Sequence, residues 1–240
     1  MAAAEGKGLD GGSATMPRTL ADSAIAVLHE AILNGEFEPG ERLRIDDLAT
    51  RLRMSPMPIR EALRQLDARG LVEHTPHRGA KVAEFSVQDM RETTRVRLVL
   101  EPLAVRDAAE RLSEEDAGAV REHLRAWHVA KRGKEVQRAR QEHARFHLTL
   151  YKAAGSRWLM RSILPAWENG ERYRLEGVDD RDTLQMRMEE HTRILDHCVA
   201  GEADAAGDAL HDHLAATANT IGRRMGYEGD LFAFRGKDAP

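Results

Sequence analysis

The stretch that decides the fold of the N-terminal region is residues 45–82, which read IDDLATRLRMSPMPIREALRQLDARGLVEHTPHRGAKV. Within it, apolar residues recur at helical spacing over 45–52 and again over 56–69. Between these segments, Ser55-Pro56 supplies a hydroxyl for an N-cap and a proline suited to the first helical position. The pattern predicts two consecutive short helices joined by a tight turn.

The residues on either side of these helices complete a motif. Apolar residues at helical spacing over 20–32 predict a preceding helix, which an Asn-Gly pair ends. After the last helix, short segments at 71–74 and 80–82 predict the two strands of a hairpin. Helix, helix, turn, helix and hairpin is the order of a winged helix-turn-helix domain, which we assign to residues 17–84.

The charge of the chain is informative only when it is divided along the sequence. The formal net charge of −4 gives no global indication of nucleic-acid binding. Residues 17–50 hold three Arg and seven acidic residues, whereas residues 51–81 hold seven basic and three acidic residues. The positive block coincides with the last helix of the motif and the hairpin, and phosphate contacts need such a concentrated cationic surface.

We therefore expect double-stranded DNA to bind at this helix and hairpin. Arg60 and Arg64 lie one helical turn apart, so both can face a DNA groove. The start of the helix offers backbone N–H groups to a phosphate, and a glycine at the hairpin turn allows close approach. The alternative, that these arginines lie on solvated helix faces, is weaker because helix order, hairpin and local charge agree. The expected DNA-binding residues are Arg44, Arg53, Ser55, Met57, Arg60, Arg64, His77, Arg78 and Gly79.

The rest of the chain has longer helical patterns than the first region. Residues 86–224 hold long amphipathic patterns with few helix-breaking residues, which predict an all-α antiparallel bundle of six to seven helices. The fold class is therefore mainly α. Residues 1–16 are predicted to be a disordered lead and 225–240 a loose tail. Three apolar residues of the tail could dock on the bundle: Leu231, Phe232 and Phe234.

Composition bounds the class of protein. The 240 residues are 42% hydrophobic, 32% charged and 5% aromatic, which suits a helix-rich protein with a sizeable core. The single Cys198 excludes an intramolecular disulfide and is expected to pack in the core. No apolar run approaches the ~18 residues of a membrane span, and the N-terminus lacks the apolar centre of a signal peptide. We therefore expect a cytoplasmic protein with no membrane partner.

Four histidines of the second region occupy helix positions where aliphatic residues are expected. They are His143 and His147 on a helix predicted at 135–153, His191 on one at 184–200, and His213 on one at 202–221. One inward histidine is ordinarily a hydrogen-bonded core residue. Burying several unpaired imidazoles costs on the order of 1–3 kcal/mol for each unsatisfied group, and a shared metal ion removes that cost. By contrast, His197 and His211 fall outside the apolar faces of their predicted helices and are expected in solvent.

The four histidines therefore predict a divalent metal site. Imidazole ligands favour Zn, with Ni or another first-row metal as the alternative.

The N-terminal region resembles the DNA-binding domain of GntR-family bacterial transcription regulators over about 65 residues. The resemblance implies that Arg60 contacts bases and that Gly79 sits at the tip of the wing. The family often has Arg directly after the Ser that caps the recognition helix, whereas this chain has Pro56. One usual DNA contact is therefore missing. The matching motifs, in order, are AILNG at 31–35, PGERL at 39–43, DLA at 47–49, MPIREAL at 57–63, GLV at 70–72 and RGA at 78–80.

The second region resembles the all-helical FCD effector domain of the FadR-type subfamily. The matching motifs are VRLVLEPLA at 96–104, FHLTL at 146–150, EHTRIL at 190–195 and HDHL at 211–214. Many members hold a metal with one Asp and three His, and His147, His191 and His213 match those histidines. The Asp normally stands where this chain has His143. A four-His site leaves the ion its full +2 charge and favours softer metals and an anionic extra ligand, unless His143 points away.

The resemblance also implies a small carboxylate effector beside the metal. Candidate partners for its charge are Arg97, on the first long helix, and Arg172 and Arg174 in the ERYR stretch. Each of the three could instead be an ordinary surface arginine. Glu142 is not an obvious substitute for the missing Asp, because it is rotated by about 100° from His143 on the helix.

Three classes of function are consistent with these features. The favoured one is a ligand-responsive transcription regulator, for example a repressor, that binds a roughly palindromic operator as a homodimer. A second is a metal sensor, in which the ion itself is the signal. The third, a metalloenzyme, is disfavoured because the chain has no His-Glu-x-x-His motif and no carboxylate on the inward stripe to act as a general base.

Overall fold

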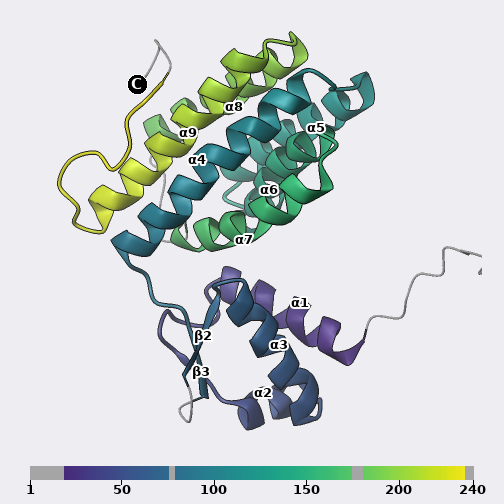
Figure 1. Cartoon of the computed structure of the whole chain (residues 1–240), viewed down its shortest axis with the longest axis vertical. Coiled ribbons are helices and arrows are strands. Elements are labelled where there is room, and N and C mark those ends of the chain that lie inside the picture. Colours follow the sequence, from purple (N-terminus) through teal and green to yellow (C-terminus); the bar gives the residue numbers. More distant parts are fainter. Residues whose placement is uncertain (1–18, 76–78, 175–180, 236–240) are drawn as a thin grey trace, which may run out of the picture.

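The computed structural model describes residues 19–75, 79–174 and 181–235, which form two helical units (Figure 1). The expected disordered lead, 1–16, lies outside the described residues. The first unit contains α1 (Leu20–Leu33), β1 (Arg42–Leu43), α2 (Ile45–Leu52), α3 (Pro56–Ala68), β2 (Val72–Thr75) and β3 (Gly79–Val82). The second contains α4 (Val87–Ala109), α5 (Glu114–Arg132), α6 (Val136–Ala153), α7 (Arg157–Tyr173), α8 (Arg181–Val199) and α9 (Ala203–Arg224). The predicted fold class, a winged helix-turn-helix followed by an all-α bundle, is confirmed.

The first unit packs three short helices against a small antiparallel sheet. Ile59 and Leu66 on α3 and Leu28 on α1 are fully buried and share one apolar core with Leu71. The sheet has the order β1-β3-β2, and its central strand pairs with both neighbours. The strand β1 was not predicted, because two residues are too few to show a periodic pattern.

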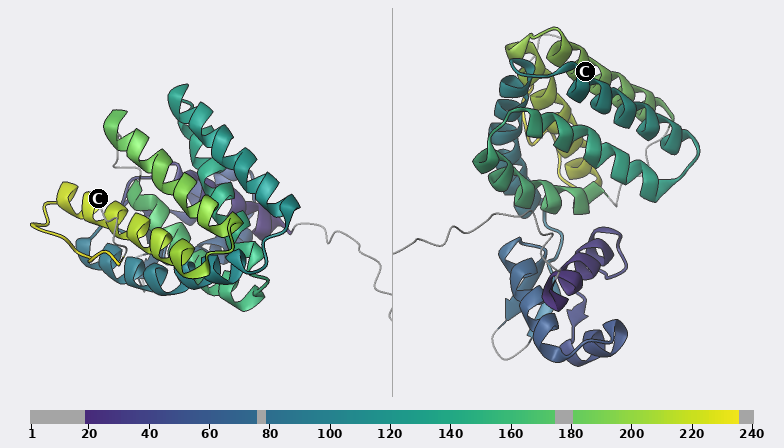
Figure 2. Two further views of the ribbon diagram at one scale, coloured as in Figure 1. Left: turned by 90° about the horizontal axis from the view of Figure 1, so that it is seen from above. Right: turned by 90° about the vertical axis from the view of Figure 1, so that its right-hand side faces the viewer.

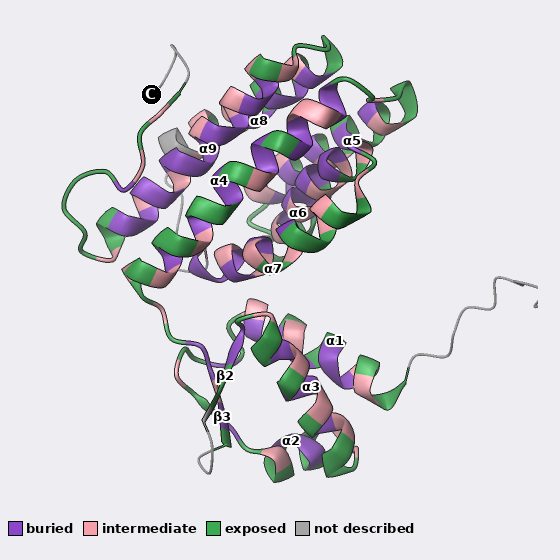
Figure 3. Ribbon diagram, viewed as in Figure 1, coloured by how far each residue is buried: buried purple, intermediate pink, exposed green. Residues whose placement is uncertain are grey.

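The second unit is a bundle of six described helices around a large apolar core, with a smaller apolar cluster of Met90, Tyr173, Ile221 and Leu231 (Figure 2). Helix α4 packs against α6, α7, α8 and α9, while α5 packs on α6 and α8. In Figure 3, the helices turn their buried faces inward and their exposed faces to solvent. Cys198 is 1% exposed within this core, as predicted. None of the helices in the described ranges is long and apolar enough to cross a membrane.

Hydroxyl N-caps set where several helices begin. At each, the side-chain oxygen accepts a hydrogen bond from the backbone N–H three residues later, which satisfies a donor that the helix leaves free. The caps are Thr19 for α1, Ser86 for α4, Ser113 for α5 and Ser156 for α7. Ser86 therefore ends the connection between the two units and starts the bundle.

The segment after α9 is anchored on the bundle over its described part. Asn219 is 1% exposed; its side-chain oxygen accepts from the backbone N–H groups of Leu231 and Phe232, and its amide donates to the Phe232 carbonyl. Leu231 is buried, and Phe232 and Phe234 pack against the bundle core. The expectation of a loose tail is therefore wrong for residues 225–235. The buried amide of Asn219 bonds this segment, and three of its own apolar side chains pack on the bundle, as the sequence allowed.

Helix α7 of the second unit contacts the first unit. Glu168 lies 3.2 Å from Nε2 of His29 on α1 and 3.8 Å from the guanidinium of Arg69 beyond α3. One turn later, Arg172 is 2% exposed and donates to the backbone carbonyl of Ala83. Two adjacent turns of a single bundle helix therefore hold the first unit.

Candidate DNA-binding surface and metal centre

Helix α3 separates a buried face from an exposed one. Ile59 and Leu63 point into the core, whereas Arg60 is exposed and Met57 is 69% exposed. Arg60 makes no ion pair with any described residue. The face that leaves the core is thus free to enter a DNA groove.

Arg64 lies on the same exposed face but has a partner within α3. Its Nε and Nη2 atoms donate to the Glu61 carboxylate over 3.0 and 2.6 Å. This pairing lowers the pKa of Glu61 to about 2, with a further bond from Gln65. Arg64 shares two of its five guanidinium N–H donors with Glu61, whereas Arg60 has no ion-pair partner among the described residues, so Arg60 is the stronger candidate for base contact.

Two further exposed cations flank α2 and have no ion-pair partner among the described residues: Arg44 at its start, and Arg53 in the turn before α3. Arg53 has a left-handed backbone with φ of 53°. Ser55 makes no capping bond, contrary to expectation, because the third helical residue, Pro58, has no N–H to donate. Its hydroxyl is therefore left for another partner.

The structure describes the wing only in part. Gly79 begins β3 with φ of 83°, and a Cβ there would meet nothing within 4 Å. The positive φ, rather than a lack of space, is what favours glycine at this position. The other two residues expected at the wing, His77 and Arg78, lie outside the described residues.

The four predicted histidines meet in the interior of the bundle. His143 and His147 come from α6, His191 from α8 and His213 from α9, and none is more than 3% exposed. One nitrogen of each lies within 4.8 Å of the corresponding nitrogens of the others. Nε2 of His147 is 3.1 Å from Nε2 of His143 and 3.0 Å from Nε2 of His191. We call these four residues the histidine cluster.

Hydrogen bonds on the far side of two rings set which nitrogen carries the proton. Nδ1 of His191 is 2.6 Å from the backbone carbonyl of Arg187, which can only accept, so Nδ1 is the donor. Nδ1 of His213 is 2.6 Å from the Glu190 carboxylate and donates to it. In the neutral rings, both Nε2 atoms are therefore unprotonated, and each directs its lone pair toward the other histidines.

A third ring is fixed through a tyrosine. Tyr151 donates its hydroxyl proton to Glu101 over 2.7 Å, so its oxygen accepts from Nδ1 of His147 at 3.2 Å. Nε2 of His147 is then also a lone pair, 3.0 Å from that of His191. Facing lone pairs repel, and a cation between them removes the repulsion. The cluster therefore fits a metal ion with imidazole ligands held by carboxylate and carbonyl partners.

Burial keeps the cluster in the form that binds metals. Desolvation lowers the pKa of His143, His147 and His191 well below the usual range of histidine, and neighbouring histidines and Arg174 lower it further. The pKa of His213 is lowered by the same desolvation and partly restored by Glu190. All four rings are therefore neutral ligands at pH 7.

Comparison with known proteins agrees with this architecture. The FCD domain family matches residues 92–216, more than half of the chain, and the gntR family of bacterial regulatory proteins matches residues 20–82. The chain belongs to the GntR family and carries an FCD domain. It is a transcription regulator and not an enzyme, as predicted.

Individual GntR relatives are similar over most of their length. The HTH-type transcriptional regulator BphR of Paraburkholderia xenovorans is 28% identical over 85% of this chain and 86% of its own. The repressor RspR of Escherichia coli is 23% identical over 86% and 91%. The solved structure of E. coli McbR/YncC, 23% identical, superposes with a TM-score of 0.77 over 86% of this chain and 99% of its own, which supports the fold.

The arginines expected at the effector site of this GntR protein occupy three different environments. Arg97 is buried and forms an ion pair with Glu101, with Nε 2.6 Å from Oε1, and it stacks on the Trp167 ring. Arg174 is 3.6 Å from Glu171 and contributes to the low pKa of the cluster histidines. Arg97 and Arg174 line one small enclosed cavity of about 20 Å³ between α4, α7 and α9.

Arg172 points away from that cavity. Its guanidinium donates to the Ala83 carbonyl and to Asn169, and it lies over the Phe85 ring, at the contact between the two units. The structure therefore does not bring Arg172, an expected effector residue, to the cavity that Arg97 and Arg174 line. Arg172 and Arg174 are two residues apart on a helix, so their side chains leave it in nearly opposite directions.

Several important side chains were not predicted. Each meets a partner on another helix or on the next turn of its own helix; they are Glu101, Tyr151, Glu171, Arg187 and Glu190. A buried carboxylate four residues after Arg97, and Tyr151 four after His147, were the available signals. His211, expected in solvent, is 6% exposed beside Asp212, so that expectation is wrong. His197 is half-buried and bonded to Glu202.

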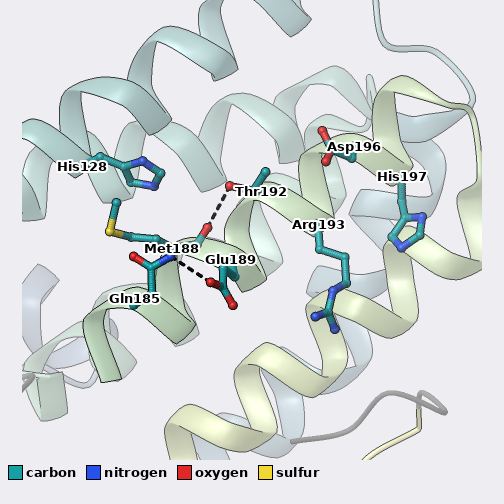
Figure 4. Close-up of a pocket in the computed structure, with 8 residues that line it drawn as sticks. All are labelled: His128, Gln185, Met188, Glu189, Thr192, Arg193, Asp196 and His197. Atoms are coloured by element: carbon teal, nitrogen blue, oxygen red, sulfur yellow. Dashed lines mark hydrogen bonds between the residues drawn. The ribbon is translucent and has the colours of Figure 1, made fainter. Parts of the chain in front are cut away.

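A larger hollow of about 480 Å³ lies on the surface of α8, beside α5 (Figure 4). Figure 4 shows polar side chains along one face of α8, where Gln185 donates to Glu189 and the Thr192 hydroxyl donates to the carbonyl of Met188. The hollow is open, and the cluster histidines do not line it. Its size alone does not make it a functional site.

Proposed function

We propose that this GntR regulator acts as a homodimer that binds a roughly palindromic operator and holds a divalent metal, with Zn favoured, in the histidine cluster. Arg60 supports the DNA part, because it is exposed on α3 and free of ion pairs with described residues. A dimer would present two such helices to successive major grooves. In the binding assays, the operator probe is a DNA fragment that the wild-type protein selects from a random pool.

The single observation that carries the metal proposal is the convergence of three Nε2 lone pairs. Those of His147, His191 and His213 are set by partners on the far side of each ring. His143 supplies a fourth imidazole 3.1 Å from His147, in place of the Asp that the family resemblance implies. A bound metal would supply a Lewis-acidic positive charge at this point. The residues then hold that ion in place and orient any anion beside it.

We further propose a small carboxylate as the effector, with Arg174 as its anion partner on the protein. Arg97 already has its charge neutralised by Glu101 and would serve only by exchanging that partner. The hydroxyls of Thr93 and Thr94 line the same cavity and can donate to a carboxylate, whereas Thr217 already donates to the backbone carbonyl of His213. Because the cavity is only about 20 Å³, an effector enters only after side chains move.

The small cavity also favours a second candidate function, a metal sensor. In the described conformation the cavity lined by Arg97 and Arg174 holds about one water molecule, so the ion alone could be the signal. Both functions use the same DNA-binding surface, and they differ in what changes the affinity for DNA.

The test combines elemental analysis with DNA binding. We expect about one Zn or other divalent ion per chain in purified protein, lost in His147→Ala/His191→Ala. Small carboxylates are then screened for a thermal shift and for a changed Kd of the selected DNA, with and without chelator. A carboxylate that acts only on metal-loaded protein supports the effector proposal, and chelator acting alone supports the sensor. Purified protein without metal, and without a thermal shift on adding Zn²⁺ or Ni²⁺, would refute the metal site.

A further inference from the structure

Two buried groups beside the histidine cluster lack hydrogen-bond partners among the described residues. They are Nδ1 of His143 on α6 and Oε1 of Glu171 on α7. His143 is 3% exposed and Glu171 is 5% exposed, so both side chains are shielded from bulk solvent. Nδ1 of His143 lies 4.0 Å from the other carboxylate oxygen of Glu171. The unpartnered Nδ1 of His143 therefore faces the Glu171 carboxylate, through Oε2, just beyond hydrogen-bond distance.

The position of the ring proton explains this separation. Without a cation, His143 can keep its proton on Nε2 and donate it to the lone pair of His147 at 3.1 Å. Nδ1 is then a lone pair, and it faces a carboxylate that also only accepts. No bond can form between them, which agrees with the distance of 4.0 Å.

The same ring has the opposite arrangement when Nε2 binds a metal ion. Nε2 must then be the lone pair, so the single ring proton is on Nδ1. That new donor is buried, and an unpaired buried donor is costly. Among the described residues, Glu171 is the carboxylate that faces Nδ1, and a side-chain movement of about 1 Å would bring it to hydrogen-bond distance.

Glu171 also connects the cluster to the DNA-binding unit. It sits on α7 between Glu168 and Arg172, the two residues that hold the first unit. A movement of Glu171 toward His143 would therefore displace the turn of α7 that contacts the first unit through Glu168 and Arg172. Nε of Arg174 lies 3.6 Å from Oε1 of Glu171, so the two side chains form an ion pair at the end of α7.

We propose that Glu171 accepts the Nδ1–H of His143 when the cluster holds a metal ion, and that this bond links the metal site to the DNA-binding unit through α7. The inference rests on the proposed metal site and assigns Glu171 as a positioning residue. It also supplies the carboxylate that this chain lacks at position 143, one bond removed from the ion.

The test uses full-length Glu171→Gln and Glu171→Leu, with Glu189→Gln as a control because Glu189 is an exposed acid on α8. Zn²⁺ dissociation constants are measured by chelator competition. We expect Glu171→Leu to weaken Zn²⁺ binding roughly 10–100-fold, since outer-sphere partners have effects of this size. Glu171→Gln keeps an acceptor oxygen and should lose less, while Glu189→Gln should match wild type.

Two further measurements report the bond and its consequence. In ¹⁵N-labelled wild-type protein, Zn²⁺ should bring out a slowly exchanging imidazole N–H signal from Nδ1 of His143, absent in Glu171→Leu. In wild type, Zn²⁺ should change the Kd of the selected DNA about fivefold or more, and in Glu171→Leu less than twofold. Circular dichroism and thermal unfolding establish that each variant is folded.

The outcomes separate this inference from the proposal beneath it. If wild type binds no Zn²⁺, the metal site itself is refuted. If wild type binds Zn²⁺ and His147→Ala abolishes binding, but Glu171→Leu keeps the wild-type Zn²⁺ Kd and the wild-type effect on DNA, only the role of Glu171 is refuted. Should Glu171→Leu fail to fold, the wild-type spectrum decides: a Zn²⁺-loaded protein without the His143 Nδ1–H signal overturns the inference.

Discussion

Lowering the pH from 7.5 to 5.5 should strongly destabilise the metal-free protein. Desolvation in the bundle holds the pKa of His143, His147 and His191 well below the usual range of histidine in the folded state. In the unfolded chain the same rings have a pKa of about 6.5. Below that value the unfolded state binds more protons than the folded state, so stability falls as the pH falls.

The magnitude follows from the number of buried rings. For each neutral histidine that stays unprotonated when folded, the drop from pH 7.5 to 5.5 costs about 1.4 kcal/mol. Three such rings cost about 4 kcal/mol, a large part of the roughly 5–15 kcal/mol that stabilises an ordinary domain. His213, whose pKa is lowered less strongly because Glu190 opposes the shift, adds to this loss.

The assay is chemical denaturation of chelator-treated protein at several pH values. His143→Leu removes one buried ring and should reduce the loss by about 1.4 kcal/mol, while His74→Gln, on an exposed β2 position, should leave it unchanged. A total loss below about 1.5 kcal/mol in wild type would show that the rings are not buried as neutral groups. Saturating Zn²⁺ should shift the loss to lower pH, because protons must then displace the ion.

Three other perturbations test separate parts of the structure. Arg60→Ala should weaken binding of the selected DNA about 5–150-fold in fluorescence anisotropy, and Arg64→Ala less, because its guanidinium is paired within α3; equal effects would contradict this ranking. Leu63→Ala, at a buried core position, should lower the free energy of unfolding by about 2–5 kcal/mol, and a loss under 1 kcal/mol would be inconsistent with the described core. Asn219→Ala should speed amide hydrogen exchange at Leu231 by releasing the C-terminal segment, and unchanged protection there would show that the apolar contacts suffice.

Local pattern was enough to predict the three helices and the hairpin of the first unit, and the four histidines that meet in the second. Helical spacing identified α3 and its exposed Arg60, because residues three and four apart share a helix face whatever surrounds them. The same rule marked His143 and His147 as one face of α6. A different rule, the preference for a hydroxyl at the N-cap, failed for Ser55, where Pro58 removes one of the two N–H groups that a cap can use.

The sequence by itself determined the family, the order of the helices and which four histidines turn inward. Only the tertiary structure decided what those histidines contact: Tyr151 and Glu190 behind two of the rings, and Glu171 opposite His143. It also decided that Arg172 lies at the contact between the two units. The physical reason is that periodicity sets which face of a helix is buried. The partner on that face comes from another helix, and its identity depends on how the helices pack.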